Sequence, residues 1–121
     1  MDEKKNLKLL ERLKLLKEKP ALVIGHSSPV PYSIVANYLQ GYFDGMGVSC
    51  GININLSITN WWKNKVNVTG GFYMDRGITL INKGKSEEEL KRILMSETIN
   101  FFSENPDWDI KEIECIVEDK D

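Results

Sequence analysis

One histidine, two adjacent serines and two cysteines are the chain's candidates for nucleophilic chemistry. His26 is followed directly by Ser27 and Ser28 in a short polar stretch, whereas Cys50 and Cys115 lie far along the chain. Catalytic residues often lie on such loops, and a nucleophile needs a base within hydrogen-bond reach. Neighbouring residues of one loop do not form such a pair, and no G-x-S-x-G turn is present. We predict that the protein is not an enzyme, with catalysis through His26 as an alternative.

Metal-binding and phosphate-binding residue types are present, but their spacing does not fit a site. Zinc and iron sites need clustered His, Cys or carboxylate side chains. The acidic residues near the C-terminus do not follow the spacing of a twelve-residue calcium loop, and no turn glycine lies among them. Gly70-Gly71 and Gly45-x-Gly47 lack the remaining residues of a phosphate-binding loop. We therefore predict no metal and no cofactor.

Two adjacent tryptophans are the first candidate for binding. Trp61 and Trp62 fall in a polar stretch that reads as a loop, and adjacent side chains of an extended segment face opposite ways. One of them is then exposed, covered by another element or at an interface, and tryptophan is enriched at binding hot spots. The alternative is that both cover the edges of the core. Lys63 and Lys65 are too few for a nucleic-acid groove, so we predict no nucleic-acid partner.

The acidic C-terminal end is the second candidate for binding. Net charge is −2, yet residues 1–20 hold seven basic and four acidic side chains, and residues 104–121 hold two basic and eight acidic ones. An acidic face disfavours nucleic acid and favours a basic partner. The alternative is that these charges only keep the end of the chain solvated and bind no partner. The carboxylates that we predict to contact a partner are Asp107, Asp109, Glu112, Glu114 and Glu118.

Three helices follow from periodicity and capping signals. Residues 3–18 carry leucines at spacings of three and four among Lys and Glu, which predicts an amphipathic helix. Residues 31–46 carry a broad apolar face, and Gly47 fits a left-handed cap. Gly41 and Gly45 inside this helix indicate that another element approaches closely there. A third helix begins with the capping box Ser86-x-x-Glu89 and ends near Ser103.

The middle of the chain, residues 48–84, predicts β structure. Apolar residues alternate with polar ones over 52–58, the period of a strand with one wet face. Phe72–Met74 and Ile78–Ile81 read as short strands joined by a turn. Residues 109–117 read as a final edge strand, and Ala21–Ile24 reads as a strand or a linker. We expect a single α+β domain over residues 1–121, with three helices packed on a small, mostly antiparallel sheet.

Composition fits a folded cytoplasmic protein. With 41% hydrophobic and 28% charged residues, the chain resembles globular domains rather than disordered ones. No apolar run approaches the length of a transmembrane helix, and charges interrupt the first leucines where a signal peptide would be uniformly apolar. Two cysteines without a CxxC motif are predicted to be reduced thiols. We predict no membrane partner.

Two short motifs resemble a pattern found in small bacterial proteins. KPALVIG at residues 19–25 and YLQGY at residues 38–42 resemble the motifs R-P-x-M-Y-[IL]-G and F-[LIV]-x-G-Y, and Ile78–Ile81 followed by the helix 87–103 resembles the end of those proteins. Lys19 stands in place of the arginine, and Leu22-Val23 in place of Met-Tyr. Such proteins are similar to immunity proteins of polymorphic and contact-dependent toxin systems. The resemblance implies an intracellular binding protein without catalytic residues.

The residues and the resemblance together predict an immunity-like inhibitor that binds and occludes a cognate protein toxin, such as a basic nuclease. The acidic end would cover the toxin's basic site, with Trp61 or Trp62 as an apolar anchor. The alternative is a small-molecule or nucleotide-binding protein, a sponge or a sensor, with a pocket near the His26 loop and the helix 31–46. A homodimer is also left open.

Overall fold

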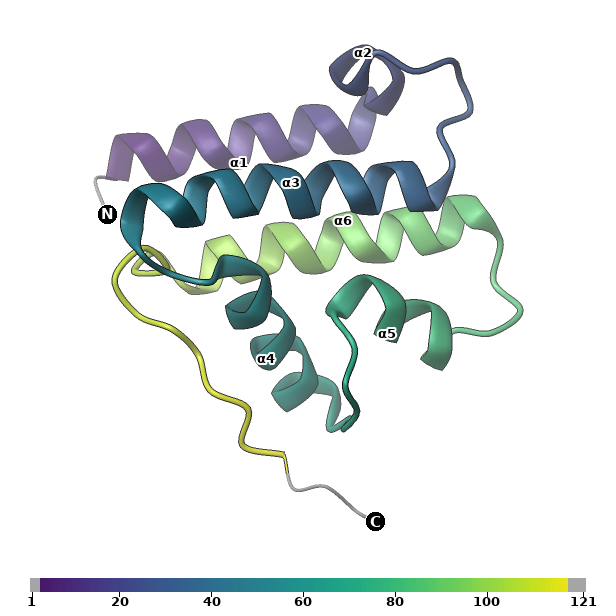
Figure 1. The fold of residues 1–121 in the computed structure, drawn as a ribbon. Helices are drawn as coiled ribbons and strands as arrows, with labels where there is room; N and C mark the ends of the chain where they lie inside the picture. Colours follow the sequence, from purple (N-terminus) through teal and green to yellow (C-terminus); the bar gives the residue numbers. More distant parts are fainter. Residues whose placement is uncertain (1–2, 118–121) are drawn as a thin grey trace.

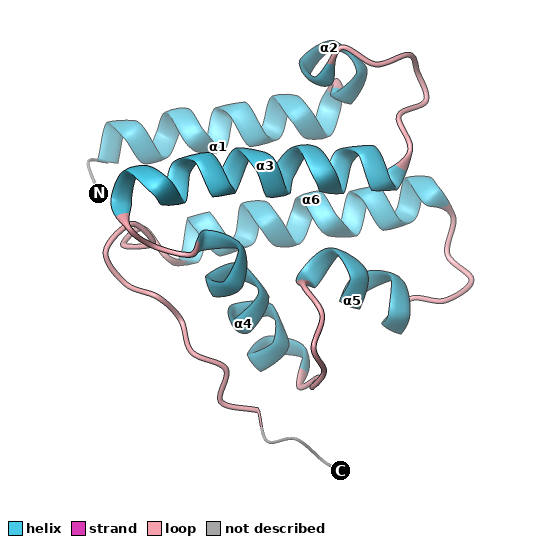
Figure 2. Ribbon diagram, viewed as in Figure 1, coloured by secondary structure: helices cyan, strands magenta, loops and turns pink. Residues whose placement is uncertain are grey.

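The computed structural model describes residues 3–117 and contains only helices and loops (Figures 1 and 2). Its helices are α1 (Glu3–Glu18), α2 (Pro20–Ile24), α3 (Tyr32–Cys50), α4 (Ile54–Val66), α5 (Met74–Ile81) and α6 (Glu87–Glu104). No strand occurs among the described residues. The predicted α+β fold with an antiparallel sheet is therefore wrong, and this part of the chain is all-helical.

The long helices α1, α3 and α6 run beside one another, with α1 antiparallel to the other two (Figure 1). The shorter α4 and α5 pack against this bundle, and α6 contacts α1, α3, α4 and α5. Phe101 and Phe102 in the last turn of α6 are fully buried. The ring of Phe102 lies 5.3 Å from that of Phe43 and 5.5 Å from that of Trp108. An aromatic cluster of the core therefore lies at the C-terminal end of α6.

Leucine periodicity located α1 correctly, and a capping signal located α6. The expected helix over residues 3–18 is α1, and its buried side chains are leucines of the predicted stripe. Ser86 caps the start of α6 as expected, because its Oγ accepts the Glu89 N–H and donates to the Glu89 carboxylate, both at 3.2 Å. The predicted end near Ser103 agrees with the end of α6 at Glu104.

The ends of α2 and α3 differ from expectation. Residues 21–24 belong to the short helix α2 rather than to a strand or a linker, and Gly25 ends it with a left-handed φ of +76°. Helix α3 continues past Gly47 and ends before Gly51, which has a φ of +73°. Its first N–H, that of Tyr32, donates to the Glu87 carboxylate at 2.8 Å.

The alternating stretch over residues 52–58 begins a helix instead of a strand. The side chain of Asn53 accepts the N–H of Leu56 at 3.1 Å and so caps the start of α4. Ile54 and Ile58 are buried, and a spacing of four residues puts two side chains on one face in both helices and strands. Leu56, which only a strand would place on that face, is 41% exposed.

The two short apolar runs at 72–74 and 78–81 are also not strands. The predicted turn between them lies inside α5, which continues from Met74 to Ile81. Gly77 belongs to this helix and faces the buried ring of Trp62. A Cβ at this position would lie 2.5 and 2.7 Å from two ring carbons of Trp62, and 2.8 Å from a ring carbon of Phe72. Glycine is therefore required where α5 crosses α4.

The close approach predicted at Gly41 and Gly45 is wrong. A Cβ on either glycine would have no neighbouring atom within 4 Å. The close contact of α3 occurs at Gly47 instead, where a Cβ would collide with the carbonyl oxygen of Ile52. Spacing alone did not show which glycine faces a neighbour, because that depends on the path of the chain after α3.

Replacing Gly77 with alanine should lower the free energy of unfolding by about 1–3 kcal/mol, because the added methyl group overpacks the buried Trp62 ring. Gly41→Ala is the matched control and should raise it by about 0.5–1 kcal/mol, since exposed helical glycine has excess unfolded-state entropy. Urea unfolding measures both values. Equal effects of the two substitutions would contradict the packing of α5 on α4.

Candidate protein-binding site

The acidic tail, residues 107–117, follows α6 and extends beside α4 (Figure 1). Its start is fixed by Trp108, which is 5% exposed and meets Phe102 edge to face at 5.5 Å. Trp108 Nε1 also donates to Asn6 Oδ1 in α1 at 3.2 Å. Because a buried aromatic side chain anchors this point, the path of the acidic tail begins from a fixed position on the core.

Polar side chains on one face of α4 bind the main chain of the acidic tail. We call this set the α4 ladder; it consists of Ser57, Asn60 and Asn64. Spacings of three and four residues place these side chains in a row along the helix. Asn64 makes two bonds: its Nδ2 donates to the Glu114 carbonyl at 2.9 Å, and its Oδ1 accepts the Ile116 N–H at 2.8 Å. Its amide therefore pairs with the tail much as a neighbouring strand would.

The other two members of the α4 ladder bind a single residue of the tail. Ser57 Oγ accepts the Ile113 N–H at 2.9 Å, and Asn60 Nδ2 donates to the Ile113 carbonyl at 2.9 Å. The side chain of Ile113 is half-buried against the core. The edge strand predicted at 109–117 is therefore wrong: residues 109 and 110 lie in a turn, and the rest of the segment is bound by side chains of a helix rather than by a sheet.

The carboxylates predicted to contact a partner have different surroundings. Glu112 Oε1 accepts the Asn53 N–H at 2.9 Å and so binds the N-terminal end of α4, where the helix dipole favours negative charge. Glu114 is exposed and is bound through its main chain alone, whereas Asp107 and Asp109 are half-buried. Glu118 lies outside the described residues.

The exposed apolar side chains of the acidic tail are a feature that the sequence reading missed. Ile110 is 74% exposed and Ile116 is 79% exposed, although Ile113 between them is half-buried. Their spacing of three residues was the available signal, since in an extended segment it cannot place all three on one face. The tail therefore presents apolar as well as acidic groups to solvent.

The two tryptophans lie in the middle of α4 rather than in a loop. Neighbouring residues of a helix differ in direction by about 100°, so both can face inward. Trp62 is 1% exposed. Trp61 is half-buried, with its ring 5.7 Å from that of Phe101 and Lys65 Nζ 5.0 Å from its centre. Trp62 thus has no surface to offer a partner, and Trp61 has part of one.

The structure separates the residues considered for catalysis. His26 is exposed just before α3, and its Nδ1 lies 2.7 Å from the Ser27 carbonyl. Cys50 lies at the other end of α3, a helix about 28 Å long at 1.5 Å per residue.

Burial, together with the charge of Asp75, raises the pKa of Tyr32 far above its ordinary value. Its hydroxyl is therefore a neutral donor, bonded to the Asp75 carbonyl at 2.5 Å.

Residues 3–117 also lack the groupings that a metal site or a membrane span would need. Within this range no three His, Cys, Asp or Glu side chains are grouped so that they would hold a metal ion. The helices of the same range are each too short or too polar to cross a membrane.

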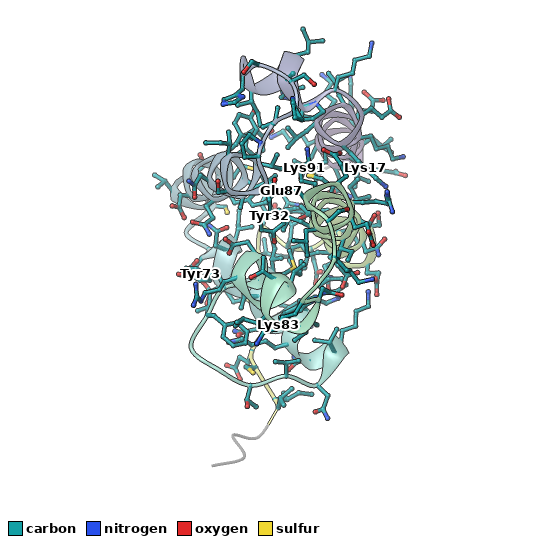
Figure 3. The ribbon with its side chains drawn as sticks, turned by 90° about the vertical axis from the view of Figure 1, so that its right-hand side faces the viewer. Lys17, Tyr32, Tyr73, Lys83, Glu87 and Lys91 are labelled. Carbon is teal, nitrogen blue, oxygen red and sulfur yellow. The ribbon has the colours of Figure 1, made fainter. Side chains whose placement is uncertain are left out.

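A cavity of about 390 Å³ lies at the end of the bundle where α1, α6 and the loop before α3 meet. Lys91 is buried there, and its Nζ donates to the Val30 carbonyl and to Glu88, both at 2.7 Å. Lys17 and Arg92 also line the cavity, and Figure 3 shows Lys17 and Lys91 at this end of the molecule. The histidine of the loop does not line it.

Removing the amide of Asn64 should free the far end of the acidic tail. In Asn64→Ala the Ile116 N–H loses its acceptor, so its hydrogen exchange should accelerate roughly tenfold, the equivalent of one or two hydrogen bonds. Exchange of the Ile113 N–H, which Ser57 accepts, should change less. Residue-resolved exchange by NMR measures both rates, with Asn37→Ala on the exposed face of α3 as control. Unchanged exchange at Ile116 would contradict the docking.

Comparisons with protein-family models, with curated proteins and with solved structures found no match for this chain. The resemblance of residues 19–25 and 38–42 to immunity-like proteins therefore stays a prediction from the sequence. The features of the structure that bear on function are the α4 ladder, the acidic tail and the cavity beside Lys91.

Proposed function

We propose that this protein is a non-catalytic, immunity-like inhibitor that binds a cognate protein toxin and covers a basic region of it. The observation that supports this proposal most is the docking of the acidic tail on α4. Three α4 side chains and the buried Trp108 hold this segment, which turns at residues 106–110 and then runs beside α4. A partner that binds it does not have to pay the entropy of ordering a flexible chain.

The surface chemistry of the acidic tail suits a basic partner. Four carboxylates and one lysine lie between residues 107 and 117, so the segment carries an excess of negative charge. Complementary charge increases the association rate and selects against acidic partners. Catalytic surfaces of nucleases are basic because they bind phosphates, which makes such a toxin a suitable target.

Apolar anchoring is assigned to isoleucines instead of tryptophans. Trp62 is buried, whereas Ile110 and Ile116 expose most of their side chains on either side of the exposed Glu114. Burial of such side chains in a partner's pocket slows dissociation. We propose that charge draws the toxin to the acidic tail and that the two isoleucines hold it there.

Neutralising Glu114 tests this proposal. Glu114→Gln should weaken binding to the polypeptide encoded next to this one by about two- to fivefold, the worth of an exposed ion pair, and should reduce the salt dependence of the affinity. Glu11→Gln, on the exposed face of α1, should leave both unchanged. Calorimetric titrations at several salt concentrations measure affinity and slope.

Two results would contradict the inhibitor proposal. One is the absence of any binding between this protein and the neighbouring polypeptide. The other is an equal effect of Glu114→Gln and Glu11→Gln, because the acidic tail would then be no special part of the surface. Urea unfolding of both variants checks that neither substitution acts through stability.

A second candidate function is favoured by the cavity beside Lys91. Lys17, Lys91 and Arg92 line about 390 Å³ of space, together with Glu18 and Glu88. Pockets of this size with few, convergent charged groups are typical of small-ligand sites. We propose that an anionic small molecule, a phosphate or a nucleotide, is the ligand in this alternative. The cations come from α1 and α6, so binding would link these two helices.

Lys17 and Lys14 form a matched pair for testing the cavity. Both are exposed lysines of α1, but only Lys17 lines the cavity. Inorganic phosphate and nucleoside monophosphates should raise the melting temperature of the protein, and Lys17→Gln should reduce this rise by about half while Lys14→Gln does not. Thermal unfolding at fixed ionic strength measures the effect. Equal responses of the two variants would indicate nonspecific ion binding and exclude this function.

A further inference from the structure

The α4 ladder recognises main-chain atoms. Its bonds reach the N–H and carbonyl of Ile113, the carbonyl of Glu114 and the N–H of Ile116. None of them reaches a side chain of the acidic tail. We propose that the α4 ladder is a binding site for an extended segment of a partner protein, and that the chain's own acidic tail is its resident, exchangeable occupant.

The resident occupant defines the chemistry of the segment that fits. The position of Ile113 is half-buried and takes an apolar side chain. The preceding position takes a carboxylate, because Glu112 accepts the Asn53 N–H at the start of α4. The partner segment is therefore an acidic residue followed by an apolar one in an extended chain.

The hydrogen bonds add a rule about proline. The residue at the Ile113 position must supply both an N–H and a carbonyl, and the residue three positions later must supply an N–H. Proline has no N–H. A segment with proline at the Ile113 position therefore loses the bond to Ser57, although its composition changes little. Two peptides that differ only by proline at this position should therefore differ in their affinity for the α4 ladder.

The acidic tail can leave α4 without opening the core. The last deeply buried side chain before the end of the described chain is Trp108, and the tail beyond it is mostly exposed. After this point the contacts of the segment include those of the α4 ladder and of Glu112, and its half-buried residues are Asp109, Ile113 and Val117. Such a segment belongs to the least stable part of a fold and opens locally.

Competition between the tethered acidic tail and a free peptide sets the peptide concentration that is needed for displacement. A tethered segment has an effective concentration of about a millimolar. A free peptide with the same contacts therefore displaces half of the resident tail at roughly millimolar concentration. This inference goes beyond the proposed function and needs no toxin, and it fails separately: peptide exchange can be absent while Glu114→Gln still weakens toxin binding.

The test uses the full-length ¹⁵N-labelled protein and the unlabelled peptide DIKEIESIV, which has the sequence of residues 109–117 with serine in place of cysteine. On addition of about 1–5 mM peptide, the Ile113 and Ile116 amide signals should move to the positions of an unfolded chain. The side-chain amide signals of Asn60 and Asn64 should stay at their bonded positions, because the peptide replaces the tail.

Two controls decide between the outcomes. DIKEPESIV, with proline at the Ile113 position, should require at least fivefold more peptide for the same effect, the loss of about one hydrogen bond. In Asn64→Ala the Ile116 amide signal should already lie near its unfolded position and respond little to the peptide, whereas Asn37→Ala on α3 should retain the full response. Equal displacement by both peptides, or none at 5 mM, would overturn the proposal. So would tail signals that change with protein concentration alone, since the occupant would then be the tail of a second copy.

Discussion

Burial of Phe101 and Phe102 at the end of α6 is the interaction on which the rest of the structure depends. Their rings meet at 4.9 Å edge to face, and through them α6 reaches α3, α4 and the residue that starts the acidic tail. Aromatic side chains bury a large area each, and edge-to-face pairs add specific geometry. Because Trp108 packs on this pair, the position of the acidic tail follows from the core.

The sequence predicted the helices that carry strong local signals and missed those whose signals are ambiguous. Ser86 and Glu89 located the start of α6 because a capping box depends only on local residues. The alternation around Ile54 and Ile58 is satisfied by a helix as well as by a strand, and only the exposed Leu56 distinguishes them. The exposure of Leu56 depends on tertiary packing, which the local pattern of a single sequence does not show.

The acidic side chains of the candidate site were predictable from charge, but the contacts that hold them in place were not. The acidic residues were identified from composition, and they do form a distinct segment on the surface of α4. Counting charges did not show that Glu112 binds the N-terminal end of α4, just as Glu87 binds that of α3. Both carboxylates satisfy N–H groups that a helix leaves without a partner, and both come from distant parts of the chain. A carboxylate that the sequence predicts to contact a partner can thus stabilise the fold instead.

The α4 ladder has a consequence for how this protein can change over time. Because Ser57, Asn60 and Asn64 hold main-chain atoms, the outward side chains at Ile110, Glu114 and Ile116 carry no part of the docking. Substitutions at these positions leave the scaffold intact, provided that position 116 keeps its N–H. The exposed side chains of the acidic tail are thereby free to vary, while the helix beneath them stays the same. Such a division lets the surface of the acidic tail change by single substitutions while its main-chain docking on α4 is kept.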